Sequence, residues 1–168
     1  NSMRPLIKSM KIQNAGWYLL EAPYTVNEGD GWSWSYEISD GNWEIDEPKR
    51  LLNNFFSELF KKYTSKNVYV LGFSQGGLVC FDFVLYLDQS LGGVFPICGF
   101  LRQPKVEIER FHPSQKNTPI LIGHGKDDDK VPVKASENAY RLLIKQEANV
   151  ELLLYNGKHK IGMDYMKK

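Results

Sequence analysis

The stretch VYVLGFSQGG, residues 68–77, decides the fold of this chain. Its first half is short, apolar and partly β-branched, which is typical of a buried strand. In its second half three glycines surround Ser74, and a nearly uniform apolar helix pattern begins at Gln75. We expect a strand that turns sharply into a helix, with Gly72 and Gly76 relieving side-chain clashes at the turn and Gly77 allowing close helix–sheet packing.

The rest of the chain repeats this alternation of strand and helix. Apolar spacing predicts helices over residues 2–13, 47–63, 75–88 and 133–147, and strands over 17–21, 67–73, 93–98, 118–122 and 150–155. Residues 24–47 are expected to form a loop and residues 101–117 a polar excursion. Short apolar strands that alternate with helices indicate a mostly parallel sheet with helices on both faces. The length of residues 1–168 corresponds to a single domain.

Composition and charge exclude several classes of protein. The 21 Lys and Arg residues nearly cancel the 20 Asp and Glu residues, so no electrostatic feature favours a nucleic-acid partner. No apolar run approaches the roughly 18 residues of a membrane span, and the first residues do not resemble a secretory signal. Cys80 and Cys98 both lie in apolar stretches, which favours buried free thiols over a disulfide. A cytoplasmic protein without integral membrane association is therefore expected.

Ser74 is the candidate nucleophile. It is the central residue of a G-x-S-x-G pattern, which is a weak signal alone but here lies where a strand ends and a helix begins. The helix N-terminus supplies positive potential and free N–H groups. The backbone N–H of Gln75 would be one donor to the oxyanion of a tetrahedral intermediate. The alternative is an ordinary turn in which Ser74 only caps the helix.

A serine nucleophile needs a base, and the chain has three histidines. His159 follows the last expected strand, at the edge of the sheet where open α/β folds place their sites. His124 ends another strand and remains a competing base. His112 precedes a proline in the polar excursion and is expected to be a solvated loop residue.

The base needs a carboxylate partner, and the run DDD at residues 127–129 offers three. This run lies in a loop at the same edge of the sheet, and the pattern alone does not choose among Asp127, Asp128 and Asp129. A solvated acidic loop or a weak cation site is the alternative, although three consecutive aspartates are poor spacing for calcium. The order Ser, Asp, His along the chain is the one expected for α/β-hydrolases.

These motifs together resemble the phospholipase/carboxylesterase family of α/β-hydrolases, which includes the acyl-protein thioesterases. GFSQGGL (residues 72–78) resembles the family's nucleophile signature, IGHGKDDDKVP (residues 122–132) resembles its H-G-x-x-D-x-x-V-P segment, and YNGKH (residues 155–159) is similar to its Y-x-G-x-x-H ending, one residue shorter. The resemblance implies an α/β-hydrolase fold, with Asp128 as the acid and His159 as the base. It also implies that residues 94–101, which include Leu101, contribute to the substrate side.

One departure from the family concerns the oxyanion hole. In the family a strand near the N-terminus ends in an H-G-x-G-like loop that gives the second oxyanion donor, and no such segment precedes Met3. We therefore expect one or more N-terminal strands, and the second donor, to lie outside residues 1–168. Losing one such donor costs about 10²–10³ in rate. A missing strand would also leave residues 17–20 as an unpaired edge.

The segment between Pro23 and Pro48 is rich in aromatic residues, among them Trp32, Trp34 and Trp43. The resemblance places this segment beside the substrate pocket, where it would form a wall or lid, with Trp32 and Trp34 as substrate-binding residues. The alternatives are a surface loop that packs on itself and a platform for sugars. Acidic residues among the rings make a purely apolar channel for long lipids less favoured.

We expect a serine hydrolase that cleaves small or medium carboxylic esters or thioesters through an acyl-enzyme on Ser74, without a metal or organic cofactor. An acylated protein is one alternative substrate. The rival from another class is a catalytically weak ligand-binding protein on the same fold that uses Trp32, Trp34 and Trp43. A dienelactone-hydrolase-like enzyme or a peptidase is a second rival, although the former usually has a cysteine where this chain has Ser74.

Overall fold

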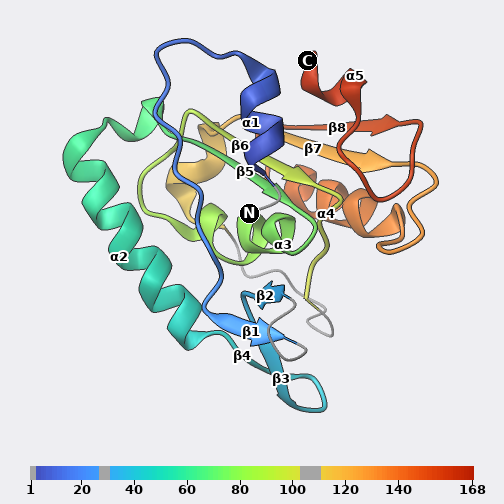
Figure 1. The fold of residues 1–168 in the computed structure, drawn as a ribbon, viewed down its shortest axis with the longest axis horizontal. Helices are drawn as coiled ribbons and strands as arrows, with labels where there is room; N and C mark the ends of the chain where they lie inside the picture. Colours follow the sequence, from blue (N-terminus) through green and yellow to red (C-terminus); the bar gives the residue numbers. More distant parts are fainter. Residues whose placement is uncertain (1–2, 27–30, 103–110) are drawn as a thin grey trace.

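The computed structural model describes residues 3–26, 31–102 and 111–168. Its centre is a four-stranded sheet in the order β5-β6-β7-β8, in which every neighbouring pair is parallel (Figure 1). The strands are β5 (Tyr69–Phe73), β6 (Gly93–Ile97), β7 (Ile120–Gly125) and β8 (Val150–Tyr155). All four carboxyl ends therefore meet at one edge of the sheet, which confirms the expected parallel α/β architecture.

Three helices, which precede β5, β6 and β8 along the chain, cover one face of the sheet. They are α2 (Asp46–Lys62), which leads to β5, α3 (Gln75–Asp82) between β5 and β6, and α4 (Lys134–Lys145) between β7 and β8. Their apolar faces meet alternate residues of the strands in the larger core, which includes Phe56, Phe81, Val94, Ile122 and Leu143. The periodicity that predicts α2 and α4 in the sequence thus corresponds to the faces they bury.

The other face of the sheet carries a smaller core. Tyr165 of the short helix α5 (Met163–Met166) is buried there and donates a hydrogen bond to the carbonyl of Leu121 at 2.6 Å. A Cβ at Gly123 would lie 2.5 Å from the Tyr165 ring, so the glycine allows this close packing. Helix α1 (Arg4–Met10) buries none of its residues.

Two predicted elements near the start of the chain differ from the structure. Helix α1 is shorter than predicted, with Pro5 in its first turn, and Ser2 lies outside the described residues. The strand predicted over residues 17–21 is wrong, since this segment forms no ladder. Trp17 and Tyr18 are 42% and 48% exposed, and Tyr18 contacts Phe55 and Tyr63 of the α2 region through ring edges. A strand exists only through backbone pairing, which the apolar pattern alone does not supply.

The predicted loop over residues 24–47 is also wrong, because its described part forms two antiparallel hairpins. Strand β1 (Tyr24–Val26) pairs with β2 (Gly31–Ser33), and β3 (Tyr36–Ser39) pairs with β4 (Asn42–Glu44). The Asp40-Gly41 turn, with Gly41 at φ 71, closes the second hairpin. Figure 1 shows both hairpins projecting from the body of the molecule, beyond α3 and the start of α2.

Three further predictions concern segment boundaries. Helix α3 ends at Asp82 rather than near Asp88, and the short 3-10 helix Val84–Tyr86 follows it. Strand β7 extends to Gly125, so His124 lies inside the strand. Of the predicted polar excursion, residues 103–110 lie outside the described residues, and a 3-10 helix covers Pro113–Asn117.

None of the helices within residues 3–26, 31–102 and 111–168 combines the length and the apolar character needed to span a bilayer. Cys80 and Cys98 are both buried, and neither forms a disulfide.

Candidate active site

Ser74 occupies a strained turn between β5 and α3. Its backbone dihedrals are φ 55 and ψ −114, in a region that costs free energy for a residue with a side chain. The turn is held by hydrogen bonds from Ser74 N–H to the carbonyl of Ile97 at 2.8 Å and from Gly77 N–H to the carbonyl of Ser74 at 2.9 Å. Strain at this position presents the side chain at the carboxyl edge of the sheet, as a nucleophile turn requires.

The glycines around Ser74 have different roles. A Cβ at Gly72 would lie 2.1 Å from the backbone oxygen of Gly76, and one at Gly77 would lie 2.7 Å from the Cα of Gly99. These two glycines therefore permit the turn and the close helix–sheet contact that the sequence predicts. A Cβ at Gly76 would meet nothing within 4 Å, so the expectation that its own side chain would clash is wrong. The crowding comes from the Gly76 backbone.

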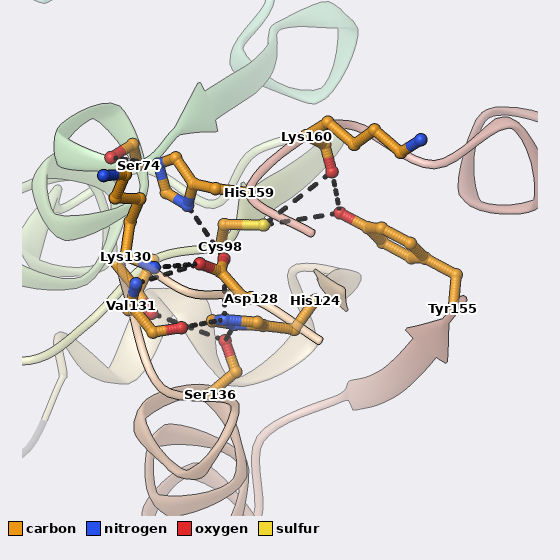
Figure 2. A network of polar contacts seen from close by, with 11 residues as sticks. Ser74, Cys98, His124, Asp128, Lys130, Val131, Ser136, Tyr155, His159 and Lys160 are labelled. Carbon is orange, nitrogen blue, oxygen red and sulfur yellow. Dashed lines mark hydrogen bonds and ion pairs between the residues drawn. The ribbon is translucent and has the colours of Figure 1, made fainter. Parts of the chain in front are cut away.

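The three residues Ser74, Asp128 and His159 meet at the edge of the sheet (Figure 2). The Ser74 Oγ lies 3.0 Å from Nε2 of His159, and Nδ1 of His159 lies 2.8 Å from Oδ2 of Asp128. The ring of Phe73 packs 4.8 Å from the imidazole of His159. The serine, the imidazole and the carboxylate are thus connected in the order that activates a serine hydroxyl.

Asp128 is the carboxylate of the DDD run that faces inward. Its side chain is 0% exposed, and its Oδ1 accepts hydrogen bonds from the backbone N–H groups of Lys130 and Val131, each at 2.9 Å. Burial raises the pKa of Asp128, but the hydrogen bonds from Val131, His159, Lys130 and Cys98 outweigh it and lower the pKa to about 2. The carboxylate is therefore charged near neutral pH.

The neighbouring aspartates do not take this place. Asp129 is half exposed and lies 3.5 Å from the ammonium group of Lys158. Asp127 contributes its backbone N–H to the carbonyl of Gly157 at 3.0 Å, which joins the acid loop to the loop that carries His159. The geometry thus separates three carboxylates that are adjacent in sequence, which the sequence pattern alone cannot do.

The other two histidines lie away from Ser74. His124 is 0% exposed within β7, where its Nδ1 lies 2.6 Å from the Ser136 hydroxyl and its Nε2 lies 2.9 Å from the carbonyl oxygen of Val131. His112 is partly buried rather than fully solvated, and its Nδ1 accepts the N–H of Ser114 at the start of a 3-10 helix. The structure brings His159 to the serine.

Gln75 has a contact that sequence reasoning missed. Its backbone N–H opens α3, where the first N–H groups have no partner inside the helix, as the expected oxyanion role requires. Its side chain also reaches the hairpins: Nε2 donates to Ser33 Oγ at 2.6 Å, and Oε1 accepts the Trp34 N–H at 3.1 Å. A glutamine directly after the candidate serine is the only sequence signal for this link.

The residues expected to bind substrate lie in different environments. Trp32 is 53% exposed on β2, whereas Trp34 is half buried and lines a groove of about 30 Å³ together with Pro48, Leu52, Val79 and Phe83. Leu101 packs against the larger core and lines a separate cavity of about 10 Å³. Trp43, named for the rival binding protein, stacks under the guanidinium group of Arg102 at 5.0 Å.

Among the described residues, Cys98, His124 and Asp128 place potential metal ligand atoms within 4.8 Å of one another. All three side chains are buried, and Figure 2 shows them side by side. Their polar atoms already make hydrogen bonds, and Nε2 of His124 faces the carbonyl oxygen of Val131, which can only accept a hydrogen bond. Ordinary polar contacts therefore account for this cluster without a metal ion.

The model of one protein family, described as phospholipase/carboxylesterase, matches residues 14–168. The carboxylesterase SOBER1 of Arabidopsis thaliana is 27% identical over 163 residues, a match that covers 89% of this chain and 72% of that protein. The acyl-protein thioesterase 1 of Kluyveromyces lactis is 29% identical over 103 residues, which are 60% of this chain and 45% of that protein.

The crystal structure of Arabidopsis thaliana SOBER1 superposes with a TM-score of 0.80 and 28% sequence identity. The superposition covers 99% of this chain and 87% of the other. The architecture, the sequence match and the arrangement of Ser74, Asp128 and His159 agree with one another. This chain belongs to the phospholipase/carboxylesterase family of α/β-hydrolases.

Proposed function

We propose that this protein is a serine hydrolase that cleaves carboxylic esters or thioesters through an acyl-enzyme on Ser74. The observation that carries the proposal is the continuous hydrogen-bond chain from Ser74 through His159 to the buried Asp128. Similarity to carboxylesterases and acyl-protein thioesterases supports the same chemistry.

In the first half of the reaction the Ser74 Oγ attacks the acyl carbon while His159 Nε2 takes the hydroxyl proton. The carbonyl oxygen becomes an oxyanion, which the N–H of Gln75 at the start of α3 stabilises. When the tetrahedral intermediate collapses, the carbon–oxygen or carbon–sulfur bond breaks. His159 returns the proton to the leaving alcohol or thiol, and the acyl group remains on Ser74.

In the second half water attacks the acyl carbon and gives a proton to His159. Collapse of this second intermediate breaks the bond to Ser74 Oγ, which recovers its proton, and the carboxylic acid leaves. Throughout, Asp128 holds Nδ1–H of His159, so that Nε2 faces the serine, and its charge stabilises the imidazolium that forms transiently.

The proposed substrate carries a small or medium acyl group, because acidic residues lie among the aromatic rings of residues 24–47. The link from Gln75 to Ser33 and Trp34 holds the aromatic segment beside the helix that follows Ser74. The groove beside Trp34, about 30 Å³ in volume and bordered by the ion pair between Arg102 and Asp82, is not lined by Ser74, Asp128 or His159. Its volume therefore does not set the acyl length. An acylated protein is the alternative substrate in this proposal, and a cytoplasmic location is also part of it.

The experiment is active-site labelling with a fluorophosphonate, combined with hydrolysis of p-nitrophenyl acetate. We expect the wild-type protein to label at Ser74 and to hydrolyse the ester, and we expect Ser74→Ala to lose both properties. A folded wild-type protein that does not label, and whose turnover equals that of Ser74→Ala, would favour the ligand-binding rival.

A series of p-nitrophenyl esters of increasing chain length, together with an S-acylated peptide, then tests the substrate class. We expect kcat/KM to peak at short or medium chains. A preference for the longest ester would contradict the small-acyl part of the proposal and leave the Ser74 chemistry intact. Turnover of the S-acylated peptide alone would favour the alternative substrate, an acylated protein.

A further inference from the structure

The carboxylate of Asp128 receives contacts from two imidazoles. His159 approaches Oδ2 from the loop after β8 with Nδ1 at 2.8 Å, and His124 approaches the same oxygen from within β7 with Nε2 at 3.2 Å. Figure 2 shows His124 on the opposite side of Asp128 from Ser74. A triad needs only the first imidazole, so the second requires an explanation.

The proton on His124 can be assigned from its partners. Nε2 faces two oxygens, the Val131 carbonyl at 2.9 Å and Oδ2 of Asp128, and neither can donate a proton while the carboxylate is charged. Nε2 therefore carries a hydrogen that is shared between them. Nδ1 lies 2.6 Å from the Ser136 hydroxyl, which holds the ring from the first turn of α4.

His124 and Ser136 are built into the fold and not into the solvent-facing part of the site. Both are 0% exposed, and Ser136 Oγ also lies 3.4 Å from the carbonyl oxygen of Gly99. The two residues thus connect α4, β7 and the turn after β6 to the acid loop. Neither side chain is exposed, and the contact of His124 with Asp128 is their direct link to the triad.

We propose that His124 is a positioning residue, which fixes Oδ2 of Asp128 in line with His159 by donating its Nε2–H, while Ser136 fixes the orientation of His124. This inference rests on the proposed function, since it concerns the same serine, histidine and aspartate. It adds two buried residues that the nucleophile, base and acid pattern does not contain.

The expected consequence is a change in the basicity of His159. A donor on Oδ2 withdraws part of the negative charge that attracts the proton of His159. Without this donor the carboxylate would hold the imidazolium more strongly, so His159 would lose its proton at higher pH. The acid limb of kcat/KM, which reports the free base, would then move upward.

One other titratable group, the thiol of Cys98, also donates a hydrogen bond to the carboxylate of Asp128, and it is unchanged in the His124 variants. Cys98, at the end of β6, is a neutral thiol whose pKa is raised by burial, and burial likewise raises the pKa of Tyr155 on β8. The ammonium group of Lys158 pairs with the exposed Asp129. Within the described part of the chain, His124 is thus the imidazole other than His159 that contacts the acid.

The test compares His124→Leu with His124→Gln. Leucine removes the donor at similar volume, whereas the longer glutamine amide can place an N–H near the position of Nε2. For His124→Leu we expect kcat to fall about 10-fold with little change in KM, and the acid limb of kcat/KM to rise by about half a pH unit. For His124→Gln we expect kcat and the pH of the acid limb to return toward the wild-type values.

A purely structural role makes different predictions. It would lower the melting temperature of His124→Leu while kcat per labelled Ser74 and the acid limb stayed at the wild-type values, and this result would overturn the proposal. If His124→Leu does not fold, Ser136→Ala is the deciding variant. We expect its kcat to fall about threefold and the acid limb of its kcat/KM profile to move to higher pH. An acid limb at the wild-type pH would count against the proposal.

Labelling of Ser74 in the wild-type protein separates the two proposals. A wild-type protein without Ser74-dependent turnover would contradict the proposed function. A wild-type protein that is active, with His124 and Ser136 variants whose acid limb does not move, would contradict only the positioning role.

Discussion

The side chain of Gln75 accepts a hydrogen bond from the backbone N–H of Trp34 at 3.1 Å, across 41 positions of sequence. With the second contact, from Nε2 to Ser33 Oγ, it ties the hairpins to the first residue of α3. The residue proposed to stabilise the oxyanion through its backbone thus also holds the hairpins through its side chain. A change of side chain here separates the two roles.

We expect Gln75→Ala to release the hairpins while its backbone N–H remains available at the helix start. Amide hydrogen exchange over residues 31–36 should become about 10-fold faster, since loss of one or two partly buried hydrogen bonds costs about 1–2 kcal/mol. The preference among ester chain lengths should broaden. Gln13→Ala, at an exposed position, is the matched control; equal exchange in both variants would show that the link does not hold the hairpins.

The two outer glycines of the G-x-S-x-G pattern should respond differently to alanine. Gly72→Ala places a Cβ 2.1 Å from a backbone oxygen, which cannot move without distorting the turn, and should lower the free energy of unfolding by about 3 kcal/mol. Gly76→Ala enters open space inside α3 and should be neutral or stabilise by up to about 1 kcal/mol. Urea denaturation of both variants checks this, and similar losses at the two positions would contradict it.

The choice of Asp128 over its neighbour can be tested with isosteric amides. Asp128→Asn should lower kcat by about 10³–10⁴, because an amide donates a proton toward His159 and favours the wrong tautomer. Asp129→Asn removes only an exposed pair with Lys158 and should retain kcat within about twofold. Steady-state kinetics on p-nitrophenyl acetate decides, and a larger loss in Asp129→Asn would mean that the acid is assigned to the wrong residue.

Asp128 should also contribute to the pH dependence of stability. Its pKa in the folded protein is about 2, below the ordinary value of 3.8. A depressed carboxyl pKa contributes stability that is fully present above the unfolded value and is lost as pH falls through the folded value. The contribution is about 2 kcal/mol, lost mainly between pH 4 and pH 2.

Urea denaturation of the wild-type protein and of Asp128→Asn, repeated from pH 7 to pH 2, gives the difference between their free energies of unfolding at each pH. We expect this difference to change by about 2 kcal/mol over the acid range and to be constant above pH 5. A difference that does not vary with pH would show that the carboxyl is not depressed in the folded protein.

Local patterns in the sequence predicted the elements that bury an apolar face. Helix α2 repeats its apolar residues every three or four positions, and β5 to β8 are short apolar runs bounded by turn residues, so their burial is encoded locally. The hairpins of residues 24–44 were not predictable in this way. Their strands are three or four residues long and largely exposed, and they depend on pairing and on the link to Gln75.

The amino-acid sequence by itself determined the strand–turn–helix unit around Ser74, the parallel sheet, and the order of serine, aspartate and histidine along the chain, because each depends on residue type and short-range spacing. The residue pattern left three aspartates open and only the family resemblance favoured Asp128. The tertiary structure showed that Asp128 faces His159, that Gln75 fastens the hairpins, and that His124 shares its proton with the acid. These relationships join side chains 31, 41 and 4 positions apart through backbone turns and helix packing. Their distances follow from how the elements meet in space, which no local pattern specifies.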